Sequence, residues 1–140
     1  MHLGFAILAI DALFWLLGEY AAKSQHYGRM TVAALIGFLG FIGSWIVGGY
    51  YYVVYYGPLV KPVIKAGSVP WAHAIAMETK EHIFLFIPFI ALTILFIVLV
   101  KGINLRRAVM WLTGLAVVLA LSIGAMGYII SAAARWGGFI

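Results

Sequence analysis

The sequence contains no cysteine and very few charged residues, and both shortages exclude certain kinds of site and fold. Without cysteine the chain has no disulfide, no iron–sulfur cluster and no thiolate metal site, so a metal would bind through His, carboxylate, Met or Tyr side chains. Charged residues make up 9% of the 140 residues, whereas 66% are hydrophobic, and the mean hydropathy is +1.10. This composition is far from that of a soluble domain and predicts an integral membrane protein whose solvent is the lipid bilayer.

The positive net charge does not indicate nucleic acid as a partner. The nine Lys and Arg residues give a net charge of +5, but they are scattered at the ends of apolar runs and never form a basic stripe. The sequence also contains no nucleophile elbow, phosphate-binding loop, zinc signature or EF-hand. A subunit for electron transfer or assembly is therefore a better prediction than a stand-alone enzyme.

Four apolar runs are long enough to cross a bilayer core of about 30 Å, which needs roughly 20 residues of helix. We expect spans at about 2–22, 30–56, 83–100 and 108–134. Spans joined by short connections pack as neighbours, so residues 1–140 are predicted to form one all-α domain, an antiparallel four-helix transmembrane bundle.

The second run carries small residues that let a neighbouring helix approach closely, and it ends in a cluster of tyrosines. The small residues recur every three or four positions and are Ala33, Gly37, Gly40, Ser44 and Gly48. The segment GGYYYVVYYG is typical of an aromatic belt at a membrane interface, although its tyrosines could also line a quinone or haem-edge site. Because Pro58, Pro62 and Gly67 break regular structure, we expect residues 57–82 to form an outer loop. A helix start is expected near Trp71.

The basic residues give a modest orientation signal. The two short connections hold Lys23, Arg29, Lys101, Arg106 and Arg107, whereas Lys61, Lys65, Lys80 and Arg135 are spread through the longer loop and the tail. The positive-inside rule then places both short connections in the cytoplasm, and both termini and the loop 57–82 outside the plasma (inner) membrane.

The densest polar cluster is the segment WAHAIAMETKEH, residues 71–82, before the third span. On a helix Glu78 and His82 share a face and Glu81 lies beside Glu78, while His73 points to the other side. This group, with His2 from the start of the first span, predicts either a surface site for a zinc, copper or iron ion or ordinary interfacial residues.

His2 and His82 begin spans that start on the same side of an up-and-down bundle. Two imidazoles that face each other across a bundle are the arrangement that binds haem b axially, and Glu78 could then orient His82. Small and aromatic residues could supply the apolar slot for the macrocycle; the glycines in question are Gly4, Gly37, Gly40 and Gly43.

Asp11 and Glu19 lie on one stripe of the first span, and an ionisable residue inside a membrane suggests function by default. Asp11 could carry a proton, contact a haem propionate or a quinone, or accept a hydrogen bond between helices. Glu19 lies near the end of the span, where it could reach the headgroups or pair with Lys23.

Three features carry a resemblance: His2, His82 with the apolar run that follows it to Arg106, and the ending GYIISAAARWG. With these the chain resembles small four-helix bacterial membrane proteins with suspected haem binding, and it is similar in plan to the four-helix anchors of b-type cytochromes. The resemblance implies axial ligands at His2 and His82. The stretch AILAID around Asp11 also resembles small multidrug transporters, which use an acidic residue in their first helix but have minimal loops.

The function predicted first is that of a haem-binding electron-transfer subunit of a larger respiratory or redox complex. Three alternatives stay open at this stage: an accessory subunit without a cofactor, an outer-face His and Glu metal site, and a proton-coupled transporter that uses Asp11. The expected partners are the lipid bilayer, a quinone, and other membrane subunits or further copies of the chain.

Overall fold

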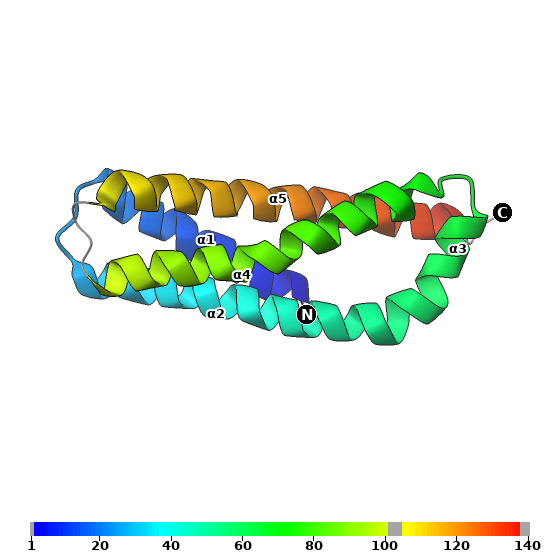
Figure 1. The fold of residues 1–140 in the computed structure, drawn as a ribbon, viewed down its shortest axis with the longest axis horizontal. Coiled ribbons are helices and arrows are strands. Elements are labelled where there is room, and N and C mark those ends of the chain that lie inside the picture. The colour runs from blue at the N-terminus through cyan, green and yellow to red at the C-terminus, as the bar shows by residue number, and fades with distance from the viewer. Residues whose placement is uncertain (1, 101–104, 138–140) are drawn as a thin grey trace.

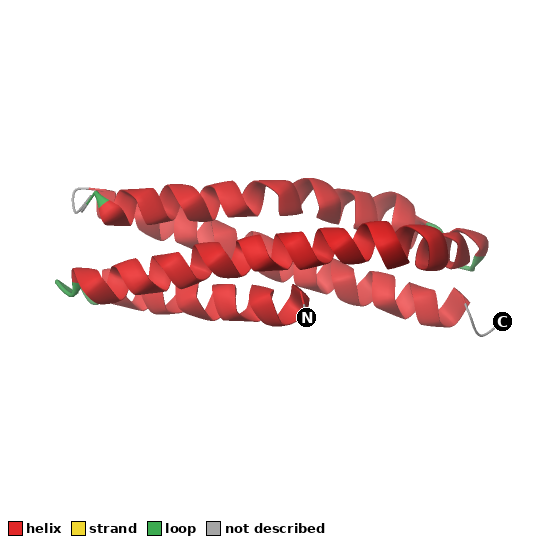
Figure 2. Cartoon of the chain, turned by 90° about the horizontal axis from the view of Figure 1, so that it is seen from below, coloured by secondary structure: helices red, strands yellow, loops and turns green. Residues whose placement is uncertain are grey.

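The computed structural model describes residues 2–100 and 105–137, and their regular structure is helical throughout. The helices are α1 (His2–Ala21), α2 (Tyr27–Tyr51), η1 (Tyr52–Val60), α3 (Lys61–Ala66), η2 (Ala72–Met77), α4 (Glu78–Leu99) and α5 (Arg106–Gly137), of which η1 and η2 are π-helices. Figures 1 and 2 show the long helices side by side along one axis of the molecule. The prediction of an all-α fold is confirmed for the described residues.

Four continuous helical stretches in the described part of the chain are long and apolar enough to cross a membrane. They are His2–Ala21, Tyr27–Ala66, Ala72–Leu99 and Arg106–Trp136. At 1.5 Å per residue the first is about 30 Å long, the thickness of a bilayer core, and the other three are longer.

The four long helices enclose one hydrophobic core. α1 packs against α2 and α5, and α4 packs against the same two helices, so every long helix has two long neighbours. Fully enclosed side chains of this core include Leu13 of α1, Phe41 of α2, Ile94 of α4 and Val109 of α5. Large apolar side chains also cover the outside of each helix. Helices that are apolar all round are typical of the interior of a large protein or of a membrane.

Small residues of α2 allow a neighbouring helix to approach closely, as the sequence predicted. A Cβ on Gly40 would lie 2.9 Å from the Cβ of Ala9 and 2.9 Å from the carbonyl oxygen of Phe5, both in α1. A Cβ on Gly37 would lie 2.9 Å from Cδ2 of Leu13. α1 and α2 therefore approach so closely that these two positions have no room for a side chain.

The predicted loop at residues 57–82 is much shorter in the structure. Helix continues from α2 through η1 and α3 to Ala66 and resumes at Ala72, so only residues 67–71 separate the two helical stretches. Pro58 lies inside η1, where each N–H bonds the carbonyl five residues back, and Pro62 lies in the first turn of α3, where a missing N–H is tolerated. Neither proline therefore ends the helix. The expected helix start near Trp71 is confirmed.

The longer helices extend beyond the beginning of α1, which lies about midway along the molecule (Figure 1). We call residues 52–77 and 128–137 the extension. It has a separate apolar core, formed by Tyr56, Ile64, Ala72, Ala76, Met77, Ile130 and Ala133. The four-helix part and the extension therefore meet at the level where α1 begins.

Candidate functional site

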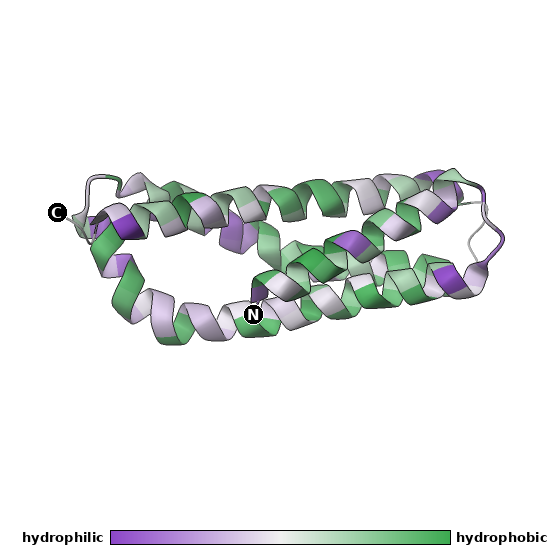
Figure 3. Ribbon diagram, turned by 180° about the vertical axis from the view of Figure 1, so that it is seen from behind, coloured by the Kyte–Doolittle hydropathy of each residue, from purple (hydrophilic) through white to green (hydrophobic). Residues whose placement is uncertain are grey.

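His2 lies at the beginning of α1, against α2 and α4. Its ring stacks on the ring of Tyr51, with 6.1 Å between the centroids and 27° between the planes. The Cβ position of Gly48 is 3.9 Å from the Cβ of His2 and 3.7 Å from the ring of Phe84. Three helices meet here, and Figure 3 shows hydrophilic residues beside the N-terminus between long hydrophobic stretches.

Lys80 and Glu81 of α4 add one charge of each sign near His2. Lys80 interacts electrostatically with His2 and with Glu81, and its Nζ lies 3.5 Å from the Cβ position of Gly127 in α5. Glu81 lies near Tyr52, and its Oε1 atom is buried without a hydrogen-bond partner among the residues that the structure describes. Polar groups from the α1, α2–η1 and α4 stretches thus gather at this level, beside Gly127 of α5.

A ladder of aromatic rings leads from this level into the extension. Tyr51 stacks on Tyr55 with 5.7 Å between centroids, and Tyr52 stacks on Tyr56 with 5.4 Å between centroids. Tyr56 in turn contacts His73, with 3.0 Å between its hydroxyl oxygen and Nδ1. Residues four apart on a helix lie on the same side, which explains the two stacks. Tyr52 and Tyr56 are therefore part of the packing of the extension.

The Tyr56–His73 pair was not singled out as a site from the sequence. His73 is 3% exposed and Tyr56 is 2% exposed, so the hydrogen bond between them is closed to solvent. Depending on the imidazole tautomer, either the phenol O–H donates to Nδ1 or Nδ1–H donates to the phenol oxygen. The two residues lie on the π-helices η1 and η2, an irregularity that is frequent at functional sites. Chemically the pair can share one proton.

His82 lies on the opposite side of its helix from His73, as the spacing predicted. It is exposed, and its Nδ1 lies 2.6 Å from the backbone carbonyl oxygen of Glu78. A carbonyl only accepts, so Nδ1 carries the proton and Nε2 is the unprotonated nitrogen of the neutral ring. The group of Glu78 that contacts the ring of His82 is its backbone carbonyl and not the carboxylate that the sequence suggested.

The structure does not bring His2 and His82 together as an internal pair of haem ligands. His2 stacks on Tyr51, whereas His82 is exposed on the outer side of α4. Of the glycines proposed as the haem slot, Gly37, Gly40 and Gly43 are within 3.0 Å of α1 atoms when a Cβ is added, and Gly4 is open on the outside. The described residues therefore do not fit a haem enclosed within this bundle.

The predicted metal ligands are also separate. Within residues 2–100 and 105–137, no group of three His, Asp or Glu side chains is placed to hold a metal ion. Glu78 and His82 are exposed on α4, while Glu81 faces Tyr52 and His2 faces Tyr51. The set His2, Glu78, Glu81 and His82 is not assembled by this fold alone.

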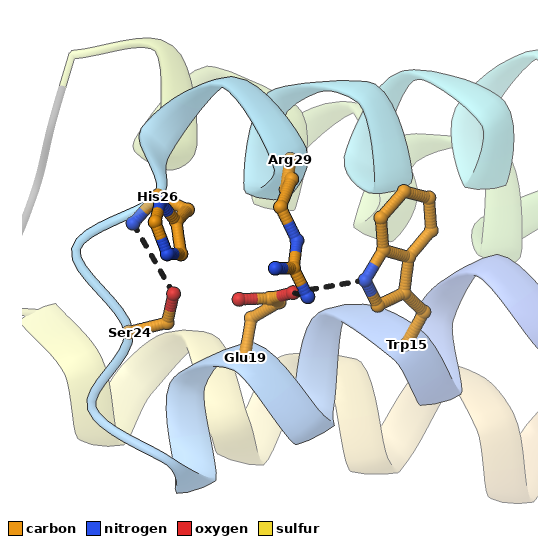
Figure 4. A network of polar contacts seen from close by, with 5 residues as sticks. All are labelled: Trp15, Glu19, Ser24, His26 and Arg29. Atoms are coloured by element: carbon orange, nitrogen blue, oxygen red, sulfur yellow. Dashed lines mark hydrogen bonds and ion pairs between the residues drawn. The ribbon is translucent and has the colours of Figure 1, made fainter.

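Glu19 pairs with Arg29, which replaces the predicted partner Lys23 (Figure 4). Its carboxylate also accepts a hydrogen bond of 3.0 Å from Nε1 of Trp15. In the same connection the backbone N–H of His26 donates to Oγ of Ser24 at 3.2 Å, which stabilises the turn. An open cleft of about 310 Å³ lies beside this network. The network joins α1 to α2 at the end where α1 finishes.

Asp11 is in the middle of α1 and faces away from the core. It is exposed, whereas Ala12 and Leu13, its neighbours in sequence, are buried. The alternative in which Asp11 accepts a hydrogen bond from another helix of this chain is not realised among the described residues.

Comparison with known proteins adds no identity. No family model, no curated protein and no solved structure matches the chain.

Proposed function

We propose that the chain is an integral membrane protein, an antiparallel four-helix bundle that serves as an accessory subunit of a larger membrane complex. The length of α1, about 30 Å at 1.5 Å per residue, suits one bilayer crossing. Lys23 and Arg29 then mark one surface of the bilayer, while His2, Lys80 and Glu81 mark the other. The extension projects beyond that second surface.

The observation that carries the proposal is the apolar surface of the extension. Several large side chains that point away from its core are exposed, among them Val53 at 73%, Leu59 at 63% and Ile75 at 62%. Outside the hydrocarbon core none of the residues that the structure describes covers them. Apolar surface of this kind marks an interaction site in proteins, so we infer that another subunit packs on the extension.

The test is isolation of the tagged chain from its native membrane in a mild detergent. Wild type is expected to elute in a complex, and the double variant Leu59→Gln, Ile75→Gln is expected to elute without its partner while far-UV circular dichroism stays unchanged. Ser68→Gln, in the exposed connection, is the matched control and should keep the partner. Elution of all three proteins as single chains would contradict the proposal.

The proposed orientation has its own test, because the chain lacks cysteine and single cysteines can be added to it. Ser68→Cys is expected to react with a membrane-impermeant maleimide in intact cells, and Gln25→Cys only after lysis. The reverse pattern would invert the topology. Lys101, one of the charges behind this prediction, lies outside the described residues.

A second candidate function is electron transfer through a haem b shared with the partner, and His82 favours it. The unprotonated Nε2 is the atom that would ligate haem iron. Because His82 is exposed, its ring is accessible to a group bound on the outer side of α4. The reduced-minus-oxidised spectrum of the intact complex tests this candidate. His82→Ala is expected to remove the absorption band, whereas His2→Ala should leave it; loss of the band in both variants would instead support the predicted pair of ligands within the chain.

Two further predictions are tested by direct measurements. Equal zinc, copper and iron contents in wild type and the His82→Ala variant would count against the predicted outer-face His and Glu metal site. Unchanged proton-coupled flux in vesicles that carry the Asp11→Asn variant would rule out the transporter as a function of this chain.

A further inference from the structure

The outer side of α1 carries a carboxylate within an apolar surface. Asp11 is exposed, and so are the large side chains one turn away on both sides, Ile7, Leu8, Phe14 and Trp15. Within residues 2–100 and 105–137 no hydrogen bond or ion pair reaches the carboxylate of Asp11. In the bilayer proposed above it lies near the midplane, since α1 continues for nine residues before it and ten after it. An ionised carboxylate there has lost its water and is costly without a partner.

Two glycines flank Asp11 on the same side of the helix. Gly4 and Gly18 each lie seven residues from Asp11, which is about two turns. A Cβ on either glycine would meet no atom within 4 Å. By contrast, α1 already occupies the space beside the glycines of α2 that face it. Open small residues let the backbone of another helix approach closely. The outer side of α1 therefore has room for a helix on both sides of its acid.

The cations that the structure describes would not supply the missing charge from a second copy of this chain. The described cations lie at the two ends of the molecule or in the interior: Lys23, Arg29, Arg106 and Arg107 at one end, Lys61, Lys65 and Arg135 in the extension, and Lys80 against Gly127 of α5. None of these lies at the level of Asp11. Two α1 helices packed about a twofold axis would bring two carboxylates together, which is repulsive.

We propose that the outer face of α1, centred on Asp11 between Gly4 and Gly18, binds a transmembrane helix of another protein that carries a lysine or arginine side chain near the middle of the bilayer. The inference rests on the proposed function, because it names the chemistry of the partner within the membrane. It depends on a different surface from the extension.

The test uses synthetic transmembrane helices in phosphatidylcholine vesicles. A leucine–alanine peptide with one central lysine carries a donor dye, and the full chain carries an acceptor on Gln25→Cys. Energy transfer is compared with that of peptides whose central residue is leucine, glutamine or glutamate. Interhelical polar contacts in model membranes predict that the lysine peptide binds about five- to thirtyfold more tightly than the leucine peptide.

The variants separate the parts of the argument. Asp11→Asn is expected to abolish the preference for lysine, and Gly18→Leu is expected to weaken binding by blocking close approach. Thr93→Val, which removes an exposed polar group in the membrane part of α4, and Gly124→Leu, at an open glycine of α5, are the matched controls and should bind as wild type does.

Several results would overturn the inference. These are equal binding of the lysine and leucine peptides, binding of the glutamine peptide as tight as that of the lysine peptide, a lysine preference that survives Asp11→Asn, and Asp11-dependent transfer between two labelled copies of the chain. A native complex that survives Asp11→Asn but is lost with Leu59→Gln, Ile75→Gln would contradict this inference alone. The opposite result would contradict the role given to the extension.

Discussion

Replacement of Gly40 by alanine places a methyl group where α1 and α2 are closest. The new Cβ would lie 2.9 Å from the Cβ of Ala9 and 2.9 Å from the carbonyl oxygen of Phe5. Carbon atoms in good contact are about 3.5–4.0 Å apart, so the two helices must separate by close to 1 Å at this point. The oxygen belongs to the backbone and cannot turn away as a flexible side chain would. The substitution therefore strains the whole α1–α2 interface.

Gly49→Ala is the matched control on the same helix, because a Cβ there meets no atom within 4 Å. Both alanines gain about 0.5–1 kcal/mol over glycine from the restricted backbone, and only Gly40→Ala bears the cost of overpacking, typically about 1–3 kcal/mol. The free energies of unfolding of the two variants are thus expected to differ by about 1–3 kcal/mol, with Gly49→Ala above wild type.

The measurement is reversible unfolding in mixed micelles by sodium dodecyl sulfate, followed by circular dichroism. Ala9→Gly in the Gly40→Ala background removes one of the two clashes and should restore only part of the loss, since the carbonyl of Phe5 remains. If Gly40→Ala unfolds at the same free energy as Gly49→Ala, the close approach of α1 and α2 described here is wrong.

Three other side chains give predictions, two in the same assay and one measured by the melting temperature. Tyr56→Phe leaves the buried Nδ1 of His73 without its partner and should lower the free energy of unfolding by about 1–3 kcal/mol, whereas Tyr55→Phe on the exposed side should change little; equal effects would refute the pairing. Thr113→Val removes a fully buried hydroxyl that has no partner among the described residues, and it should raise the free energy of unfolding by about 1 kcal/mol; a decrease would show that the hydroxyl is bonded. Glu19→Gln removes the charge from the ion pair at the end of α1, so the melting temperature should fall, by less at high salt; a loss independent of salt would point to packing instead.

The orientation and the partner of each polar side chain were only partly predictable from the sequence. The spacing of His73 and His82 placed them on opposite sides of one helix, which the structure confirms. No pattern in the sequence pointed to the partner of His73, because Tyr56 is 17 residues away on a different helix. Nor did it show that Arg29 rather than Lys23 would reach Glu19, since that choice depends on how the chain turns between α1 and α2.

The prediction of a loop at residues 57–66 was wrong, and the cause is clear. Proline removes one hydrogen bond and clashes with the carbonyl four residues back, which in an ordinary α-helix is strongly disruptive. Here Pro58 lies within a π-helix that begins at Tyr52, and the helix continues, supported by packing of Tyr56 and Ile64 in the core of the extension. The rule that proline breaks a helix considers only residues close in sequence, so it could not take this tertiary packing into account.

The sequence by itself determined that the chain is helical and apolar enough to cross a membrane four times, because hydropathy and span length are properties of consecutive residues. It also determined which face of α2 packs closely, through its repeated small residues. Only the tertiary structure decided that Asp11 faces outward, that His2 stacks on Tyr51 while His82 is exposed, and that the extension exposes apolar side chains. These features depend on the rotation of each helix about its own axis, and helices that are apolar all round carry little periodic signal for that rotation.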